Sequence, residues 1–148
     1  MQVKTGRWAR IATVGQAHWF FGNLYEAVVD IPRLTGERSP GLLTPGSPAR
    51  YFIPAAPATI ASTALALTGS WHEGGDRRAI AIAAAGTAAA TGITVQLVRS
   101  VNLPLLKEQP DLVRREELAR KWHRANLARL ALLILVRFAF RRATADRR

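Results

Sequence analysis

Two stretches without a formal charge decide the fold class: residues 51–71 (YFIPAAPATIASTALALTGSW) and residues 79–98 (AIAIAAAGTAAATGITVQLV). The first stretch has 21 residues and the second has 20. A helix of about 20 predominantly apolar residues can cross the hydrocarbon core of a bilayer. A helix on the surface of a soluble protein needs a polar face, which neither stretch offers. The two stretches therefore predict membrane-spanning helices.

Two weaker candidates flank this pair. Residues 11–25 carry no charge, and the apolar residues 125–140 contain only Arg129 and Arg137 as charged residues. Together the four stretches predict an all-α, integral membrane four-helix bundle that forms one domain over residues 1–148. The turn between the middle spans is short, so antiparallel up-down connections are expected. The predicted spans are residues 9–31, 51–70, 79–102 and 120–141.

The composition removes several classes of protein. The 148 residues include 21 Lys and Arg, 10 Asp and Glu and no cysteine, and the formal net charge is +11. A chain without cysteine has no disulfide framework, no thiol nucleophile and no cysteine-bound cluster. The basic residues flank apolar spans and form no stripe with aromatic residues, so we expect membrane lipid and no nucleic acid as a partner. A soluble, alanine-rich four-helix bundle is the alternative fold.

Polar residues inside the predicted spans are the candidates for function. In the first span, Gln16, Asn23, Glu26 and Asp30 share an arc of about 80° on a helical projection, and His18 lies at its flank. An ionisable group at membrane depth costs about 2.5–3.5 kcal/mol on insertion scales and predicts a functional role. This face of the first span should therefore point into the bundle.

The fourth span repeats the pattern. Trp122, Asn126 and Arg129 fall on one face, and His123 lies at its edge. We expect Glu26 to pair with Arg129, and the amides of Asn23, Asn102 and Asn126 to supply hydrogen bonds. The alternative is a purely structural ion pair that fixes only the register of the helices.

A metal site is a further hypothesis. His18 and His123 would meet near Glu26 if the first and fourth spans were neighbours. Two imidazoles and a carboxylate suit iron or another transition metal. However, the chain has no Glu-x-x-His or His-x-x-x-His spacing. The leading expectation is therefore acid–base chemistry by Glu26 or His123 without a cofactor, and the transition metal is the alternative.

Three motifs carry a resemblance to a known family. They are residues 19–23 (WFFGN), residues 101–105 (VNLPL) and residues 122–129 (WHRANLAR). With these motifs the chain resembles the small four-span membrane proteins called anthrone oxygenase-like (DUF1772). The resemblance implies an oxidoreductase of natural product biosynthesis that acts on a lipophilic intermediate, in a bacterial cytoplasmic membrane.

The sequence thus predicts a membrane-embedded oxygenase or oxidase with a pocket between the first, third and fourth spans. We expect Glu26, His123 and Arg129 to be catalytic. The residues expected to bind a small lipophilic substrate are Asn23, Asn102, Trp122 and Asn126. The alternative is a non-catalytic accessory subunit or carrier that docks a soluble biosynthetic enzyme. A second copy of the chain is another candidate partner, because the small residues of the third span suit helix packing in lipid.

Overall fold

The computed structural model of the chain describes residues 5–30, 48–107 and 110–145. All regular structure in these ranges is helical, which confirms the prediction of an all-α chain with four long helices. The third of the four is a continuous rod made of three segments. The elements are α1 (Thr5–Val28), α3 (Pro48–His72), α4 (Arg77–Leu97), the π-helical turn η1 (Val98–Asn102), α5 (Leu103–Lys107) and α6 (Leu112–Ala143).

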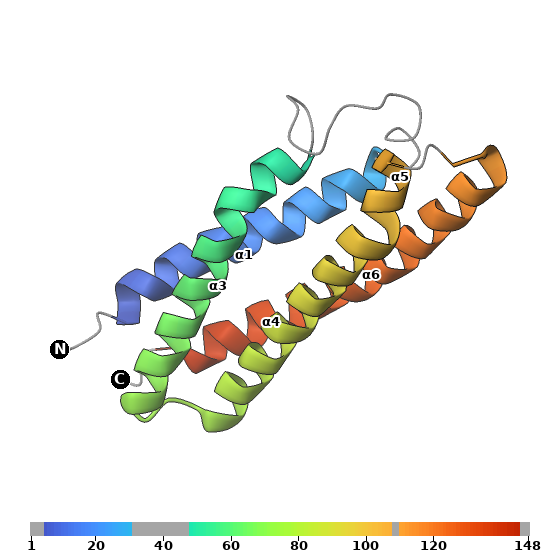
Figure 1. Cartoon of the computed structure of the whole chain (residues 1–148). Coiled ribbons are helices and arrows are strands. Elements are labelled where there is room, and N and C mark those ends of the chain that lie inside the picture. Colours follow the sequence, from blue (N-terminus) through green and yellow to red (C-terminus); the bar gives the residue numbers. More distant parts are fainter. Residues whose placement is uncertain (1–4, 31–47, 108–109, 146–148) are drawn as a thin grey trace.

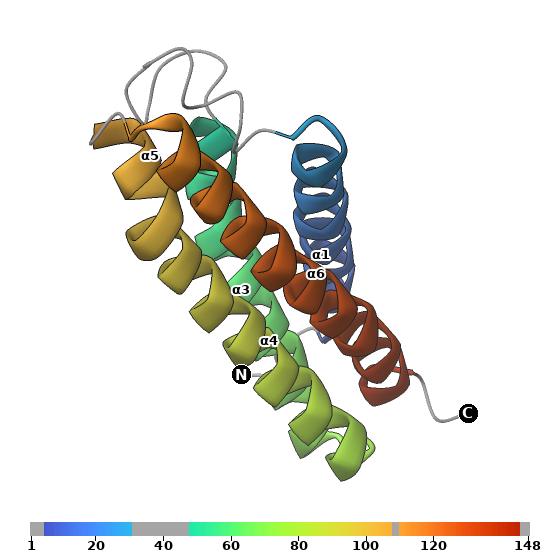
Figure 2. The same cartoon turned by 90° about the vertical axis from the view of Figure 1, so that its right-hand side faces the viewer.

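The helices run up, down, up and down (Figures 1 and 2). The start of α1, the α3–α4 turn and the end of α6 lie at one end of the bundle, which we call the turn end. The end of α1, the start of α3, η1, α5 and the start of α6 lie at the other end, which we call the η1 end. The predicted fourth span, residues 120–141, lies within α6, which begins earlier, at Leu112.

Local interactions define where the helices begin and end. Asp76 caps α4, because its carboxylate accepts hydrogen bonds from the backbone N–H groups of Arg78 and Ala79. Asp111 caps α6 in the same way through Arg114. At the end of α1, Asp30 has a φ of 57°, a left-handed conformation that terminates helices. The helix therefore ends at Val28, before the limit at residue 31 that the sequence predicted.

The closest packing occurs within two helix pairs, α1 with α3 and α4 with α6. Glycine allows both approaches: Gly15 of α1 lies against the side chain of Thr59, and Gly86 of α4 lies against Val136 of α6. The predicted neighbours α3 and α4 are antiparallel, but they separate beyond their turn (Figure 1). At the turn end the core consists mainly of alanine, with Phe140 as its largest residue.

One helical stretch in the described part of the chain is long and apolar enough to cross a membrane, namely Arg77–Leu105 with 29 residues. Only 28% of its most apolar window is buried in the bundle. The core helix of a soluble protein would be mostly buried. The described parts of the other three predicted spans, residues 9–31, 51–70 and 120–141, do not meet the same criterion, so one of the four predicted spans is supported in this way.

Candidate functional site

Arg129 is the centre of a buried polar network between α4 and α6. It is only 4% exposed. Its Nε and Nη2 atoms donate to Oδ1 of Asn126 at 3.2 and 2.6 Å, and Nη1 donates to Oγ1 of Thr94 at 3.1 Å. The Thr94 hydroxyl in turn donates to the carbonyl oxygen of Ala90, so its lone pairs are free to accept from the guanidinium. These bonds hold the guanidinium in one orientation.

Asn126 connects this network to α1. Its Nδ2 donates to the backbone carbonyl of Asn23 at 3.1 Å, and the Asn23 side chain donates to the carbonyl of Trp19. Asn126 is 1% exposed and Asn23 is 3% exposed. A buried amide with both ends occupied fixes the distance between the helices that it joins. Asn126 is thus a positioning residue, and it lies behind Arg129.

A cavity of about 240 Å³ lies in front of Arg129. It contains most of the predicted site residues: Asn23, Glu26, Asn102, Trp122 and Arg129. His18 and Trp19 of α1 and Thr59 and Ile60 of α3 complete much of the wall. The cavity therefore lies among all four long helices, whereas the sequence predicted a pocket among three. We call it the chamber.

Glu26 and Arg129 face the same chamber, but among the described residues they form no direct ion pair. Three of the N–H groups of Arg129 are bonded to Asn126 and Thr94 instead. Two of the five guanidinium N–H groups have no acceptor in the described part of the chain. A guanidinium with hydrogen bonds left to donate and the carboxyl group of Glu26 thus line one small space.

The π-helical turn η1 shapes one wall of the chamber. Pro104 has no N–H to offer the carbonyl of Ser100, and its ring would clash with that carbonyl in a regular α-helix. The helix widens instead, so that the N–H of Leu103 bonds to the carbonyl of Val98. Val98 and Asn102 of this wider turn line the chamber. The helix consequently continues through Pro104, where the sequence predicted its end at residue 102. π-Turns of this kind are frequent at functional sites.

His123 lies outside the chamber. Its Nε2 is 2.8 Å from Oδ1 of Asp30, and its ring packs edge-on against Trp122 with centroids 5.3 Å apart. Within residues 5–30, 48–107 and 110–145, no group of three or more His, Cys, Asp or Glu side chains lies close enough to hold a metal ion. The structure thus does not bring His18, Glu26 and His123 together as one ligand set. His123 contacts Asp30 instead, at the end of α1.

Two parts of the site were not among the predicted site residues: Thr94 and the wall that α3 forms. Thr94 holds Arg129, although the helical projection of the third span does put it on one side with Thr87, Thr91 and Asn102. The wall supplied by α3 was not predicted at all. Its signal is the small residue Gly15 of α1, which lets Thr59 approach closely.

No model of a known protein family, no curated protein and no solved structure matches this chain. The resemblance to anthrone oxygenase-like proteins stays a prediction that rests on the three quoted motifs.

Proposed function

We propose that the chain is a four-span integral membrane enzyme, an oxygenase that acts on a lipophilic ketone or phenol. It holds the oxygen of the substrate at Arg129 and removes a proton with Glu26. The observation that carries this proposal is the buried guanidinium of Arg129, which is fixed by Asn126 and Thr94 and faces Glu26 across a small chamber.

The surface of the bundle supports placement in a membrane. Large apolar side chains are exposed on each of the long helices, and Leu127 and Phe138 of α6 are 70% and 68% exposed. Water would oppose such exposure over a broad surface, whereas lipid favours it. Other members of this apolar surface are Ile11, Val14, Phe21, Ile60, Leu65, Val95, Ile134 and Leu135.

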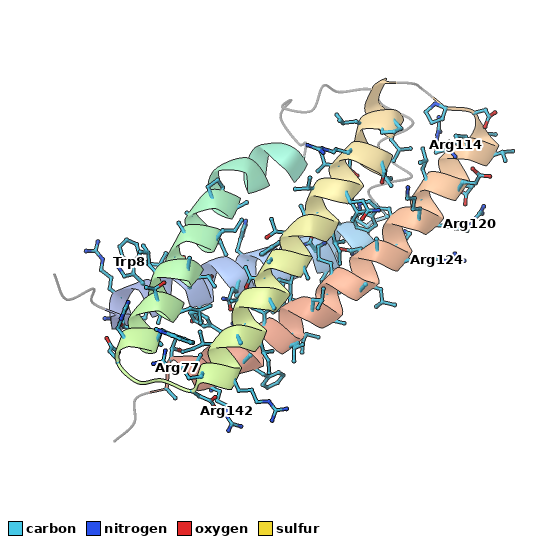
Figure 3. The ribbon with its side chains drawn as sticks, turned by 60° about the horizontal axis from the view of Figure 1, so that its bottom comes forward. Trp8, Arg77, Arg114, Arg120, Arg124 and Arg142 are labelled. Carbon is cyan, nitrogen blue, oxygen red and sulfur yellow. The ribbon has the colours of Figure 1, made fainter. Side chains whose placement is uncertain are left out.

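Charged side chains gather at the two ends of the bundle. Figure 3 shows Arg77 and Arg142 at the turn end and Arg114, Arg120 and Arg124 at the η1 end. Arg77 also lies over the ring of Trp71, 3.5 Å from its centroid. Arginine and tryptophan collect where hydrocarbon meets water. This distribution fits a bundle whose two ends lie at the two faces of a bilayer.

The threonines of α4 are suited to such an environment. The hydroxyls of Thr87, Thr91 and Thr94 each donate to a carbonyl four residues earlier in the same helix. A polar group in lipid needs an internal partner because no water is available. These three hydroxyls have one without help from solvent.

The chemistry follows from the two charges of the chamber. A carbonyl or phenol oxygen at Arg129 would accept the two remaining guanidinium N–H groups, and negative charge developing on that oxygen would be stabilised. Glu26 would take a proton from the adjacent activated methylene. The resulting carbanion would pass its electrons to molecular oxygen and form a carbon–oxygen bond. Loss of water from the hydroperoxide then gives a new carbonyl. One oxygen atom ends in the product and the other in water.

Oxygen uptake by the purified chain in lipid nanodiscs, with 1,8-dihydroxyanthrone as the substrate, tests this proposal. We expect Glu26→Gln to lower kcat by about 100-fold or more, because the proton acceptor is lost. Arg129→Lys keeps the charge but loses the fixed fork of donors, and we expect a loss of about 100-fold. Glu117→Gln, on the exposed start of α6, is the matched control and should behave as wild type. Turnover that survives in a folded Glu26→Gln variant would contradict the assignment of Glu26 as the proton acceptor. Oxygen uptake by the wild type no faster than in empty nanodiscs would contradict an enzyme and leave a carrier as the better function.

A further inference from the structure

A second, larger hollow lies beside the chamber. It is a groove of about 770 Å³ between α3 and α4, open to the side of the bundle, and we call it the α3–α4 groove. It forms where the two helices separate beyond their turn (Figure 1). Its walls are mostly small and apolar, with Ala64, Ala84, Ala88 and Gly92 among them. The groove exists because these side chains are too short to fill the space between the diverging helices.

The groove lies directly beside the chamber. Ile60, Thr91 and Val95 line both hollows. These three side chains therefore form a threshold between the lateral surface of the bundle and the site of Arg129. A change of rotamer at this threshold would join the two hollows, and a molecule in the apolar phase around the bundle would then reach the chamber without passing through either polar end.

The groove also carries polar groups of its own. Arg99, which is exposed, lies in its wall next to Ser100. The Oγ atom of Ser100 is buried and has no hydrogen-bond partner in the described part of the chain. Because this atom has no accessible surface, the exposed guanidinium of Arg99 is the polar group that an occupant of the groove would meet. The combination of an apolar wall and a cation favours an apolar molecule with a hydroxyl or carbonyl group.

We infer that the α3–α4 groove is the route by which the substrate moves sideways from the lipid into the chamber. The occupant is the lipophilic ketone or phenol of the proposed function, and it crosses the threshold of Ile60, Thr91 and Val95. The inference rests on the proposed function, since it assumes that the chamber binds such a molecule. It adds the direction of access.

Gly92 offers a way to close this route without disturbing the fold. It lies in the groove, and a Cβ atom added to it would meet no atom within 4 Å. Gly92→Leu should therefore fill the groove without a clash. Ile60→Ala is the opposite change, because it widens the threshold. Ala89→Leu is the matched control: Ala89 is exposed on the same helix but is no part of the groove.

The experiment is a stopped-flow titration of the full chain in lipid nanodiscs with 1,8-dihydroxyanthraquinone, a quinone that lacks the reactive methylene. Trp19 and Trp122 line the chamber, so a bound quinone should quench tryptophan fluorescence. A route changes the barrier and leaves the bound state unchanged. We therefore expect Gly92→Leu to slow association and dissociation together by about tenfold or more, with Kd unchanged. Ile60→Ala should accelerate both rates, and Ala89→Leu should leave both at the wild-type value.

The other outcomes separate the two proposals. If the wild-type chain binds the quinone saturably and Gly92→Leu keeps both wild-type rates, the access route is wrong and the chamber remains a ligand site. If Gly92→Leu weakens binding by accelerating dissociation alone, the groove is itself the binding site and the route is overturned. A wild-type dimer that Gly92→Leu turns into monomers would show that a second copy covers the groove, which also overturns it. Absence of any saturable quenching in the wild type contradicts the proposed function and the route with it.

Discussion

The two ends of the bundle are built in different ways. At the turn end, alanines such as Ala12, Ala66 and Ala83 are fully buried, and the helices are in close contact. Toward the η1 end, the interior holds Asn23, Asn126 and Arg129 next to a second, apolar cluster of larger side chains, and it encloses the chamber. Small residues at the turn end bring backbones together, and polar residues near the η1 end keep them apart at a set distance. The comparison shows that similar helices can pack densely at one end of a bundle and enclose a cavity of fixed shape toward the other end.

Leucine substitutions at two glycines of α4 should give the largest difference in the free energy of unfolding. A Cβ added to Gly86 would lie 2.6 Å from Cγ2 of Val136, which is 1% exposed, whereas Gly92 faces open space. We expect Gly86→Leu to lower the free energy of unfolding by about 3 kcal/mol through overpacking. Gly92→Leu should be neutral or slightly stabilising, because glycine is a poor helix former. Unfolding by sodium dodecyl sulfate in mixed micelles measures both.

A compensating change serves as the control for this pair. Val136→Ala removes the methyl group nearest to Gly86, so the double variant Gly86→Ala/Val136→Ala should be more stable than Val136→Ala alone. Equal losses of stability for Gly86→Leu and Gly92→Leu would contradict the division of the bundle into a packed end and an open end.

The polar network should give the next largest effect. Asn126→Leu leaves the Nε and Nη2 atoms of Arg129 without a partner and removes the hydrogen bond that joins α6 to the carbonyl of Asn23. We expect a loss of about 2 kcal/mol in the free energy of unfolding. The double variant Asn126→Leu/Arg129→Leu removes donor and acceptor together and should lose less than the two single variants combined. A double-mutant cycle in the same detergent measures the coupling, and strict additivity would show that the two side chains do not act as one unit.

The sequence predicted the helices well because charge-free length and helical period depend only on neighbouring residues. The same period grouped Trp122, Asn126 and Arg129 on one face, and the structure places Trp122 and Arg129 at the chamber with Asn126 behind them. Faces of single helices can be inferred in this way, because 3.6 residues per turn leave little freedom.

Contacts between helices could not be inferred in the same way. Asn126 lies closer to Arg129 than Glu26 does, and Asp30 turns to His123 through a backbone conformation with a φ of 57°. The first contact depends on the relative positions of the helices, and the second depends on one backbone dihedral angle. Neither produces a periodic pattern in the sequence. The π-turn η1 is a similar case, because it changes the period on which the interpretation of the third span depends. Pro104 is its one visible signal in the sequence, and a proline at this point is equally typical of a helix end.

The smallest predicted effect is a loss of thermal stability at low pH, which arises at the turn end. Asp76 accepts hydrogen bonds from the backbone N–H of Ala79 and from Nε of Arg142, and these lower the pKa of its carboxyl below the ordinary value. Since the pKa is lower in the folded state than in the unfolded one, ionised Asp76 stabilises the fold above the unfolded pKa. That contribution is lost as the pH falls through the folded pKa. We therefore expect the thermal midpoint of the wild type to fall as a sample is acidified below about pH 4.

Asp76→Asn separates this contribution from the other acidic groups. The amide still caps α4, but it cannot titrate, so the variant should begin with a slightly lower midpoint at neutral pH and lose less of it in acid. Arg142→Gln should have an intermediate effect, because it removes one of the interactions that lower the pKa and keeps the backbone hydrogen bonds. Both comparisons use thermal unfolding in one detergent at a series of pH values. If the thermal midpoints of wild type and Asp76→Asn decline in parallel, the acid-sensitive group lies elsewhere in the chain. The turn end would then be stabilised by alanine packing alone.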